Sequence, residues 1–415
     1  MCKPLYAHAM PTLPSPSPHA RHWTLDPGVV FLNHGSYGAC PIPVLEAQRR
    51  IRDRMERELV RFFMLEAEGL LDKARAAAAV FVRADAAGLV FLPNVTQAVA
   101  TIADNVRLSS GDEVLANDHE YSACLSTFSK ACRRAGARVV KATVPFPTRG
   151  PDEVFEAVMS AVTERTRVAL LSHITSPTAL VFPVQRLAAA LRARGIETIV
   201  DGAHAPGQVH VDVGAINAHY YCANLHKWPS CPKGSAFLWV HPERRAGFEP
   251  LAMSSRAHLD RKDRDRYLAL FDYIGTDDPT CFMAVPEALE FLPSLAGSWH
   301  AHLERNHALA LEARRMLCSA LGCEPAAPDD MVGSMATVVV PGLGLPSGGT
   351  APGRYEDSLQ EHLVERHHIQ APVWSLPSTG HRLLRVSCQA YNSPEQYEYL
   401  ARALKEELDA ERRAR

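Results

Sequence analysis

The feature that most constrains this chain of 415 residues is a regular alternation of short apolar runs and helical stretches between about residues 88 and 240. Each run is short enough for a buried strand, and the stretch after it has helical spacing. Such repetition predicts an α/β fold with a largely parallel sheet covered by helices on both faces. The expected strands are 88–92, 113–117, 138–142, 167–174, 197–201, 219–223 and 235–240. The expected helices are 94–106, 121–135, 151–163 and 184–195.

Beyond residue 285 the pattern indicates a second and smaller α/β unit. Its expected helices are 288–295, 302–322, 355–367 and a closing helix from 394, and its expected strands are 334–340 and 381–389. The Pro- and Ser-rich start of the chain has little to bury, which predicts a flexible tail. We therefore expect a tail at 1–20, a large domain at 45–285, and a small domain built from 21–44 and 286–415.

Composition excludes several classes of protein. Hydrophobic residues make up 47% of the chain, enough for a sizeable core, so a disordered chain is excluded. The net charge of -2 argues against a nucleic-acid or anionic-membrane partner, because both require a basic surface. No apolar run has the length of a signal-peptide core or a membrane span. The ten cysteines are scattered and are interpreted as reduced thiols, so we expect a cytoplasmic protein.

Three other motifs carry little chemistry. His300, His302 and His307 lie close together, but no His pair at i and i+4 accompanies them, so we expect no metal site. The glycine-rich segment 342–349 lacks the third glycine of a dinucleotide-binding loop. The run 261–266 mixes charges of both signs and is interpreted as a solvated face.

The chemistry is expected at the carboxyl ends of the strands, where sheets of this kind bind ligands. Asp201 ends one strand, and Lys227 follows the next strand along the chain. Pyridoxal 5'-phosphate (PLP) needs a lysine that forms a Schiff base with its aldehyde and a carboxylate beside its pyridinium nitrogen. Asn94, Val95 and Thr96 open a helix directly after a strand, where free N–H groups bind phosphate.

Eight sequence segments, in this order along the chain, resemble the class V aminotransferases of PLP fold type I, and most closely the isopenicillin N epimerase-like branch. The segments are FLNHGSYGACP (31–41), LPNVTQAV (92–99), NDHEYSA (117–123), SHITSPTALVFP (172–183), VDGAHAPG (200–207), NLHKWPSCPKGSAFLWV (224–240), IGTDDPT (274–280) and RVSCQAYN (385–392). The resemblance implies the PLP-dependent transferase fold type I, with a mainly parallel large domain and a smaller α/β domain.

The resemblance also implies roles at the cofactor ring. Lys227 is then the Schiff-base lysine and Asp201 the partner of the pyridinium nitrogen. His204 falls beside the phenolic oxygen of the ring, and Tyr121 falls where a flat side chain stacks on the ring face. Ser176 falls at a position near the cofactor where related enzymes have asparagine.

Further roles concern the phosphate and the substrate. Thr96, Asn224 and His226 fall at phosphate-contact positions, together with the helix start at Val95. Thr276 reaches the phosphate of a neighbouring subunit, which implies a homodimer with shared active sites. The residues expected on the substrate side are Arg385, which would clamp an α-carboxylate, and Asn33 and His34.

The expected function is that of a PLP enzyme in which Lys227 removes the Cα proton of an amino-acid-type substrate. Reprotonation on the opposite face gives an epimerase or racemase, which is the leading interpretation. Loss of a sulfur leaving group gives a Cβ–S lyase, and reprotonation at the cofactor gives an aminotransferase. A non-catalytic PLP-binding protein is the alternative of another class. The segment 367–385 contains no cysteine, which disfavours desulfuration through a nucleophilic thiol.

Overall fold

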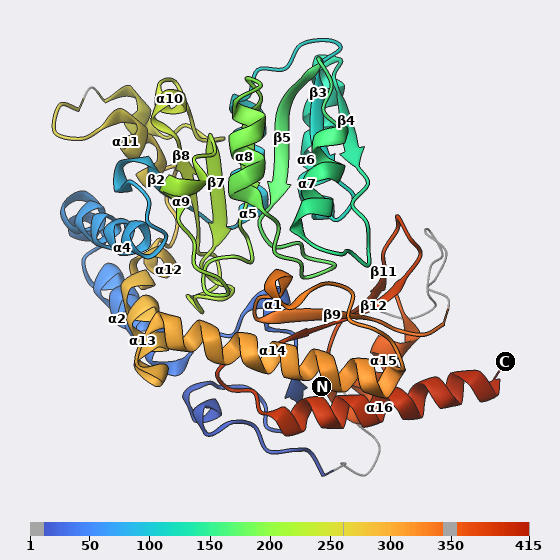
Figure 1. The fold of residues 1–415 in the computed structure, drawn as a ribbon. Coiled ribbons are helices and arrows are strands. Elements are labelled where there is room, and N and C mark those ends of the chain that lie inside the picture. Colours follow the sequence, from blue (N-terminus) through green and yellow to red (C-terminus); the bar gives the residue numbers. More distant parts are fainter. Residues whose placement is uncertain (1–11, 260, 343–354, 415) are drawn as a thin grey trace.

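The structure is a computed structural model that describes residues 12–259, 261–342 and 355–414. Within these ranges, seven strands form one large sheet (Figure 1). In spatial order they are β2 (Leu89–Leu92), β8 (Ala236–Val240), β7 (Tyr220–Asn224), β6 (Glu197–Asp201), β5 (Thr166–Ser172), β3 (Glu113–Asn117) and β4 (Arg138–Ala142). Neighbouring strands from β7 to β4 are parallel, whereas β8 runs antiparallel to both of its neighbours. The prediction of a largely parallel sheet is confirmed.

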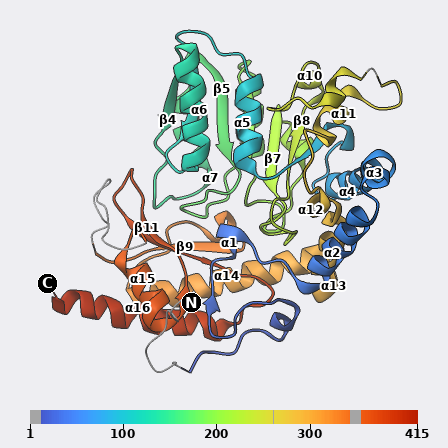
Figure 2. The ribbon, with the colours of Figure 1, turned by 180° about the vertical axis from the view of Figure 1, so that it is seen from behind.

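Side chains of the large sheet alternate between two hydrophobic cores, one on each face. In β5, Val168 and Leu170 belong to one core, whereas Ala169 and Leu171 belong to the other. Successive strand residues point to opposite faces, so a strand that is buried on both sides is apolar throughout. The first core is covered by α5 (Val95–Asn105) and α6 (Ser122–Ala135), which lie in front in Figure 2. The second core is covered by α7 (Pro151–Ser160) and α8 (Val184–Arg192).

Local signals set the ends of these helices. Asn94 Oδ1 accepts a hydrogen bond at 2.9 Å from the N–H of Gln97 and so caps the start of α5. Gly136 ends α6 in the left-handed conformation (φ 71°, ψ 20°), which costs glycine little. Because such signals are local, the expected helices 94–106 and 121–135 agree with α5 and α6 to within a residue.

A second unit lies beyond the carboxyl ends of the large sheet (Figure 1). Its described part contains an antiparallel three-stranded sheet in the order β11 (Val373–Ser375), β12 (Arg382–Ser387) and β9 (Met335–Val339). The helices that share its core are α14 (Trp299–Leu321), α15 (Ser358–His367) and α16 (Pro394–Ala414). Near the start of the chain, β1 (Val30–Phe31) pairs in parallel with β10 (Ile369–Gln370), so the two ends of the chain meet here.

Several helices fall outside the predicted alternation. The longer ones are α2 (Ile42–Arg57) and α4 (Ala67–Phe81), whereas α13 (Val285–Ala296) contains the expected helix 288–295. The shorter ones are α1 (His34–Tyr37), α3 (Leu59–Arg61), η2 (Phe62–Glu66), α9 (Val213–Ile216), α10 (Pro242–Arg245), α11 (Arg266–Asp272) and α12 (Thr280–Met283). Helix α13 packs on α4 and on α14, and its Val285 and Ala288 belong to the core of the large sheet. The chain therefore passes between the two units within α13, and the domain division at residue 285 stays a proposal.

The described part of the expected flexible tail, residues 12–20, is packed. Ser17 is buried, and its N–H donates to the carbonyl of Tyr391 at 3.0 Å. Ser393 Oγ donates to the carbonyl of Ser15 at 2.7 Å. This stretch therefore differs from the flexible tail expected for residues 1–20, because contacts with distant residues fix it. Residues 1–11, and residues 343–349 of the glycine-rich segment, lie outside the described residues.

The expected solvated face at 261–266 is wrong for Arg264. This side chain is 11% exposed and contacts two carboxylates, Asp72 at 2.9 Å and Asp272. Arg75 contacts the same two carboxylates. Two arginines and two aspartates thus neutralise one another between α4 and α11. No helix among the described residues has the length and hydropathy that a membrane span requires.

Candidate functional site

The carboxyl ends of β2, β5, β6 and β7 border one cavity. The predicted residues that line it are Val95, Thr96, Tyr121, Ser176, Asp201, His204, Asn224, His226 and Lys227. Residues that the sequence did not single out also line it, and these are Ser36, Ser172, Ile174 and Ala203. Segments from the N-terminus to residue 227 thus converge at the edge of the sheet where chemistry is expected.

Lys227 places a buried amine on the wall of this cavity. Its Nζ lies 3.0 Å from His204 Nε2. Burial lowers the pKa of Lys227 to about 7, and the nearby positive charge of Arg385 adds to this effect. At neutral pH a large share of the Lys227 amine is therefore uncharged, and an uncharged amine is the form that attacks an aldehyde.

The neighbour of this amine, His204, is a neutral hydrogen-bond donor. Trp228 Nε1 lies 3.4 Å from His204 Nδ1, and an indole N–H can only donate. His204 Nδ1 is therefore the acceptor, which leaves the ring proton on Nε2. Burial lowers the pKa of His204 well below its ordinary value, so the ring is uncharged at neutral pH. Its Nε2–H points at the Lys227 amine.

Asp201 is a buried carboxylate at the end of β6. Its Oδ1 accepts a hydrogen bond from the N–H of Ala203 at 2.8 Å, and Cys124 Sγ lies 3.3 Å from its Oδ2. Burial raises the pKa of Asp201, and Lys227 is the one cation among the described residues whose charge opposes that rise. A buried carboxylate whose negative charge is offset by so little nearby positive charge is suited to bind a protonated ring nitrogen.

Glu120 is a second buried acid beside Asp201, and the sequence predictions missed it. Its Oε1 accepts hydrogen bonds from Ser172 Oγ at 2.7 Å and from the N–H of Tyr121 at 3.0 Å. Burial and the negative charge of Asp201 raise the pKa of Glu120 to about 8, so the carboxyl is mostly protonated at neutral pH. Its place in the loop after β3, where chemistry is expected, is the signal that could have found it.

The start of α5 borders one end of the cavity. Asn224 Oδ1 accepts a hydrogen bond from the N–H of Val95 at 3.0 Å and so ties β7 to this helix start. Thr96 lies in the same first turn, where N–H groups and the helix dipole favour a phosphate. His226 is held by a 2.7 Å contact between its Nδ1 and the carbonyl of Ser235, and burial lowers its pKa to about 4. Tyr121, which is 48% exposed, lies on the cavity wall just before α6.

Arg385, in β12, brings a buried cation to the site from the second unit. Its Nη1 donates to the Ser176 carbonyl at 2.6 Å, and its Nη2 donates to Ser36 Oγ at 3.1 Å and to Asn33 Oδ1 at 3.4 Å. Its Nε has no hydrogen-bond partner, and no acid in the described residues pairs with it. Burial lowers the pKa of Arg385 to about 10, so it stays charged at neutral pH. A buried guanidinium without a counter-ion is suited to a carboxylate ligand.

His34 lies beneath the Lys227 loop, and the structure does not place it on the cavity wall. Its Nδ1 is 2.8 Å from Tyr391 Oη, and its Nε2 is 2.9 Å from the carbonyl of Lys227. Nearby, Gly38 has φ 65°, and a Cβ there would lie 2.1 Å from the carbonyl oxygen of His226. Only glycine allows the N-terminal segment to approach the lysine loop this closely. These contacts indicate that His34 supports Lys227 rather than the substrate.

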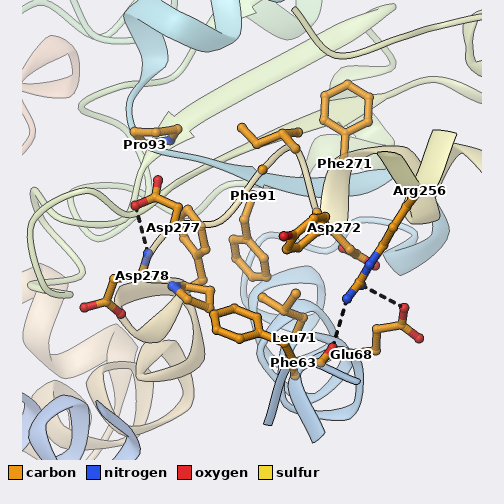
Figure 3. Close-up of a pocket in the computed structure, with 16 residues that line it drawn as sticks. Phe63, Glu68, Leu71, Phe91, Pro93, Arg256, Phe271, Asp272, Asp277 and Asp278 are labelled. Carbon is orange, nitrogen blue, oxygen red and sulfur yellow. Dashed lines mark hydrogen bonds and ion pairs between the residues drawn. The ribbon is translucent and has the colours of Figure 1, made fainter. Parts of the chain in front are cut away.

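Thr276 is the predicted cofactor residue that lies outside this cavity. It is exposed, and its Oγ1 is 2.9 Å from Tyr273 Oη. Its neighbour Asp277 lines a second cavity, shown in Figure 3 with Phe63 on its wall. Pro93 lines this second cavity, whereas the next residue, Asn94, lines the first. The two cavities are thus adjacent across the start of α5.

Comparisons of the sequence with known proteins agree with this geometry. The profile of the family described as Aminotransferase class-V matches residues 53–400. The chain is 34% identical to isopenicillin N epimerase of Amycolatopsis lactamdurans over 398 residues, which covers 92% of this chain and 96% of that protein. It is 32% identical to the isopenicillin N epimerase of Streptomyces clavuligerus and 29% identical to the L-cysteine desulfhydrase of Arabidopsis thaliana. The latter two alignments cover 92% and 94% of this chain, and 95% and 89% of those proteins.

Solved structures share the fold. A C-DES variant with glycine covalently linked to its PLP cofactor superposes with a TM-score of 0.77 at 18% identity, and the match covers 94% of this chain and 99% of that chain. The cystine C–S lyase C-DES in complex with cysteine persulfide gives a TM-score of 0.75 at 18% identity, with 91% of this chain and 97% of that chain covered. At such identities the likeness concerns the fold, and it confirms the PLP fold type I with its mainly parallel sheet.

Proposed function

Because this chain belongs to the class V aminotransferase family, we propose that it is a PLP-dependent enzyme that removes the Cα proton of an amino-acid-type substrate, as an isopenicillin N epimerase-like enzyme does. One observation carries the proposal. A lysine of lowered pKa and a buried carboxylate line a single cavity, and the buried guanidinium of Arg385 contacts Ser36 and Ser176 on its wall.

The residues present fit PLP. Lys227 would hold the aldehyde, and Asp201 would pair with the protonated ring nitrogen, which adds a second cation to the charge of Lys227 beside this buried carboxylate. His204 Nε2–H would face the phenolic oxygen. The phosphate would lie at the start of α5, where Thr96, Asn224 and His226 meet, and Tyr121 would cover a ring face. Bound PLP supplies an electron sink for the charge that develops at Cα.

The residues of this chain then divide the work of the reaction. Arg385 binds the substrate carboxylate and so fixes how Cα is presented to Lys227. The Lys227 amine takes the Cα proton, and its pKa of about 7 lets it both accept and return a proton near neutral pH. His204 holds this amine in place through the 3.0 Å contact. Epimerisation additionally requires that a proton returns to the opposite face of Cα.

A second candidate is a Cβ–S lyase that acts on a cysteine-type substrate. The described cavity wall carries one amine, that of Lys227. This favours a lyase, because elimination of a thiol after Cα deprotonation needs no second acid. Similarity to the L-cysteine desulfhydrase of Arabidopsis thaliana supports this candidate. Since the segment 367–385 lacks cysteine, sulfur would leave as a free thiol or sulfide rather than on a protein persulfide.

Incubation of the PLP-loaded enzyme with amino acids in deuterium oxide tests the proposal. We expect deuterium at Cα of recovered substrate, because the Lys227 amine exchanges its proton with solvent before it returns it. Inversion of the labelled carbon supports epimerisation, and pyruvate with sulfide from L-cysteine supports the lyase. Conversion of the cofactor to its pyridoxamine form supports an aminotransferase. A protein that binds PLP but exchanges no Cα proton with any of a full set of amino acids contradicts the proposal.

We further propose that the enzyme is a homodimer and that Thr276 contributes to the phosphate site of the partner subunit. Large apolar side chains are exposed in the segments 59–65 and 251–259, and Phe63 and Arg256 of these segments line the second cavity shown in Figure 3. They are Leu59, Val60, Met64, Leu65, Leu251, Met253 and Leu259. A patch of this kind on a soluble protein marks a contact surface. A second copy of the chain that covers this patch would bring its own Thr276 toward the start of α5 in the first copy.

Leu65, which is 74% exposed, is replaced by aspartate in the test of this interface. We expect a monomer with at least about 10-fold weaker PLP binding, because the dimer would have to bury the aspartate charge at the contact. Sedimentation and PLP titration measure the two effects. The matched control is Val80→Asp, since Val80 is 80% exposed near the C-terminal end of α4, whereas Leu65 lies in η2 before that helix. A Leu65→Asp protein that stays dimeric contradicts this interface.

A further inference from the structure

The end of α14 places two cysteines in contact. Gly322 ends the helix in the left-handed conformation (φ 65°, ψ 36°), and its N–H donates to the carbonyl of Cys318. The N–H of Cys323 also donates to this carbonyl, at 3.1 Å. The hydrogen bond from Cys323, the second residue past the helix, to Cys318 in the last turn defines a Schellman motif. This motif brings the side chains of Cys318 and Cys323 together. In most helices that contact is between apolar groups, whereas here it is between two thiols.

The two thiols differ in exposure and in acidity. Cys318 is 5% exposed and belongs to the core of the second unit, whereas Cys323 is partly exposed. Interaction between the two thiols lowers the pKa of Cys323 to about 7 and raises the pKa of Cys318. The accessible thiol is therefore the one with the larger thiolate fraction at neutral pH. Among the described residues, no third ligand joins the pair to form a metal site.

We propose that Cys318 and Cys323 form a reversible disulfide when the protein meets hydrogen peroxide. The Cys323 thiolate attacks one peroxide oxygen, the O–O bond breaks, and hydroxide leaves, which gives a sulfenic acid. Cys318 Sγ then attacks Cys323 Sγ, the S–O bond breaks, and water leaves once protons are balanced. Two thiols and one peroxide thus give one disulfide and two waters.

The geometry of the helix end suits this bond. A disulfide requires Cα atoms about 4.4–6.8 Å apart, and the 3.1 Å bond between Cys323 N and Cys318 O holds the two backbones side by side. The segment that begins at Cys323 also contacts the loops that follow β4 and β5 of the large sheet. Thr148 N–H donates to the Ala326 carbonyl at 2.9 Å, and Val181 N–H donates to the Met331 carbonyl at 2.9 Å. The disulfide would therefore tie α14 to a connection between the two units.

The chain contains a matched helix end with a single thiol. Cys132 is 2% exposed in the last turn of α6, Gly136 is left-handed, and the N–H of Ala137 donates to the Cys132 carbonyl at 2.9 Å. Ala137 is partly exposed, as Cys323 is, and burial raises the pKa of Cys132. The motif and the buried cysteine are the same, but the second thiol is absent. Ala137→Cys would supply it.

The test is peptide mass mapping of the intact, PLP-loaded protein after mild hydrogen peroxide and then an alkylating reagent. Both cysteines fall in the tryptic peptide 316–354. We expect this peptide to lose two hydrogens, to resist alkylation, and to regain both thiols after dithiothreitol. Cys323→Ser should leave Cys318 reduced and alkylated. Cys318→Ser should leave a sulfenic acid at Cys323 that dimedone traps.

Two results would overturn the proposal. One is a wild-type peptide 316–354 that keeps both alkylatable thiols at peroxide concentrations that oxidise Cys323 in the Cys318→Ser variant. The other concerns the Ala137→Cys variant under a stronger thiol oxidant: residue 137 forms no disulfide with Cys132, although the Cys318–Cys323 disulfide forms. The helix-end geometry would then not be the cause of disulfide formation. Closure of the bond between Cys132 and residue 137 in that variant supports the geometric argument.

Discussion

Replacement of Lys227 by alanine is expected to lower turnover by at least about 10³-fold and to abolish the visible absorption band of lysine-attached PLP. The expected loss is large because one side chain provides both the attachment point for the aldehyde and the acceptor for the Cα proton. The second role follows from the pKa of about 7 that burial gives the amine. Absorption spectra of the purified holoenzyme and single-turnover assays measure the two effects separately.

Lys233→Ala is the control for this prediction. Lys233 lies in the same loop but does not line the cavity, so its removal should leave the band in place and change turnover by no more than about twofold. If Lys227→Ala retained the visible band while Lys233→Ala lost it, the attachment site would be Lys233, and the assignment made above would be wrong.

The second large effect is expected from Arg385→Leu, which should raise KM for a carboxylate-bearing substrate by at least about 10²-fold while PLP absorbance stays unchanged. Two charge-assisted hydrogen bonds to the carboxylate disappear, and each such bond contributes about 1.5–3 kcal/mol. Steady-state kinetics measure this effect. An amine substrate without a carboxylate is the internal control, because its KM should not move.

The same substitution should not destabilise the protein. Arg385 is 2% exposed and has no anionic partner among the described residues, so its burial costs desolvation free energy that leucine would not. We expect the free energy of unfolding of the PLP-free Arg385→Leu protein to equal or exceed that of the wild type in urea titrations. Loss of PLP binding, or a clear loss of stability, would instead assign Arg385 a role in holding the site together.

Residues whose positions depend on local pattern could be predicted from the sequence. Asp201 and Lys227 follow strands that are apolar runs, and the start of α5 follows a third strand, so their convergence at one sheet edge follows from the parallel arrangement. The direction of β8 also has a local cause. The connection between Asn224 and Ala236 contains no helix, and a parallel crossover needs one, so β8 pairs antiparallel to β7.

Other features depend on packing between distant segments and could not be read from the sequence. Ser36 contacts Arg385 because the segment that follows β1 is bonded to β12 through Ser387, and no pattern around Ser36 indicates that contact. His34 was expected on the substrate side, yet its two ring nitrogens contact Tyr391 and Lys227 beneath the site. Glu120 owes its raised pKa to burial beside Asp201, which is a property of the folded sheet edge.

The contacts of His34 also bear on the order in which the chain acquires its site. They join residues that are 193 and 357 positions apart, and Gly38 closes the same junction against the lysine loop. Contacts of such sequence separation form late, because the entropy of closing long loops must be overcome first. A nascent chain that ends before Tyr391 can complete the large sheet but lacks the support beneath Lys227. Tight retention of PLP is thus expected to report the arrival of Tyr391, which makes cofactor capture a sign that the two units have joined.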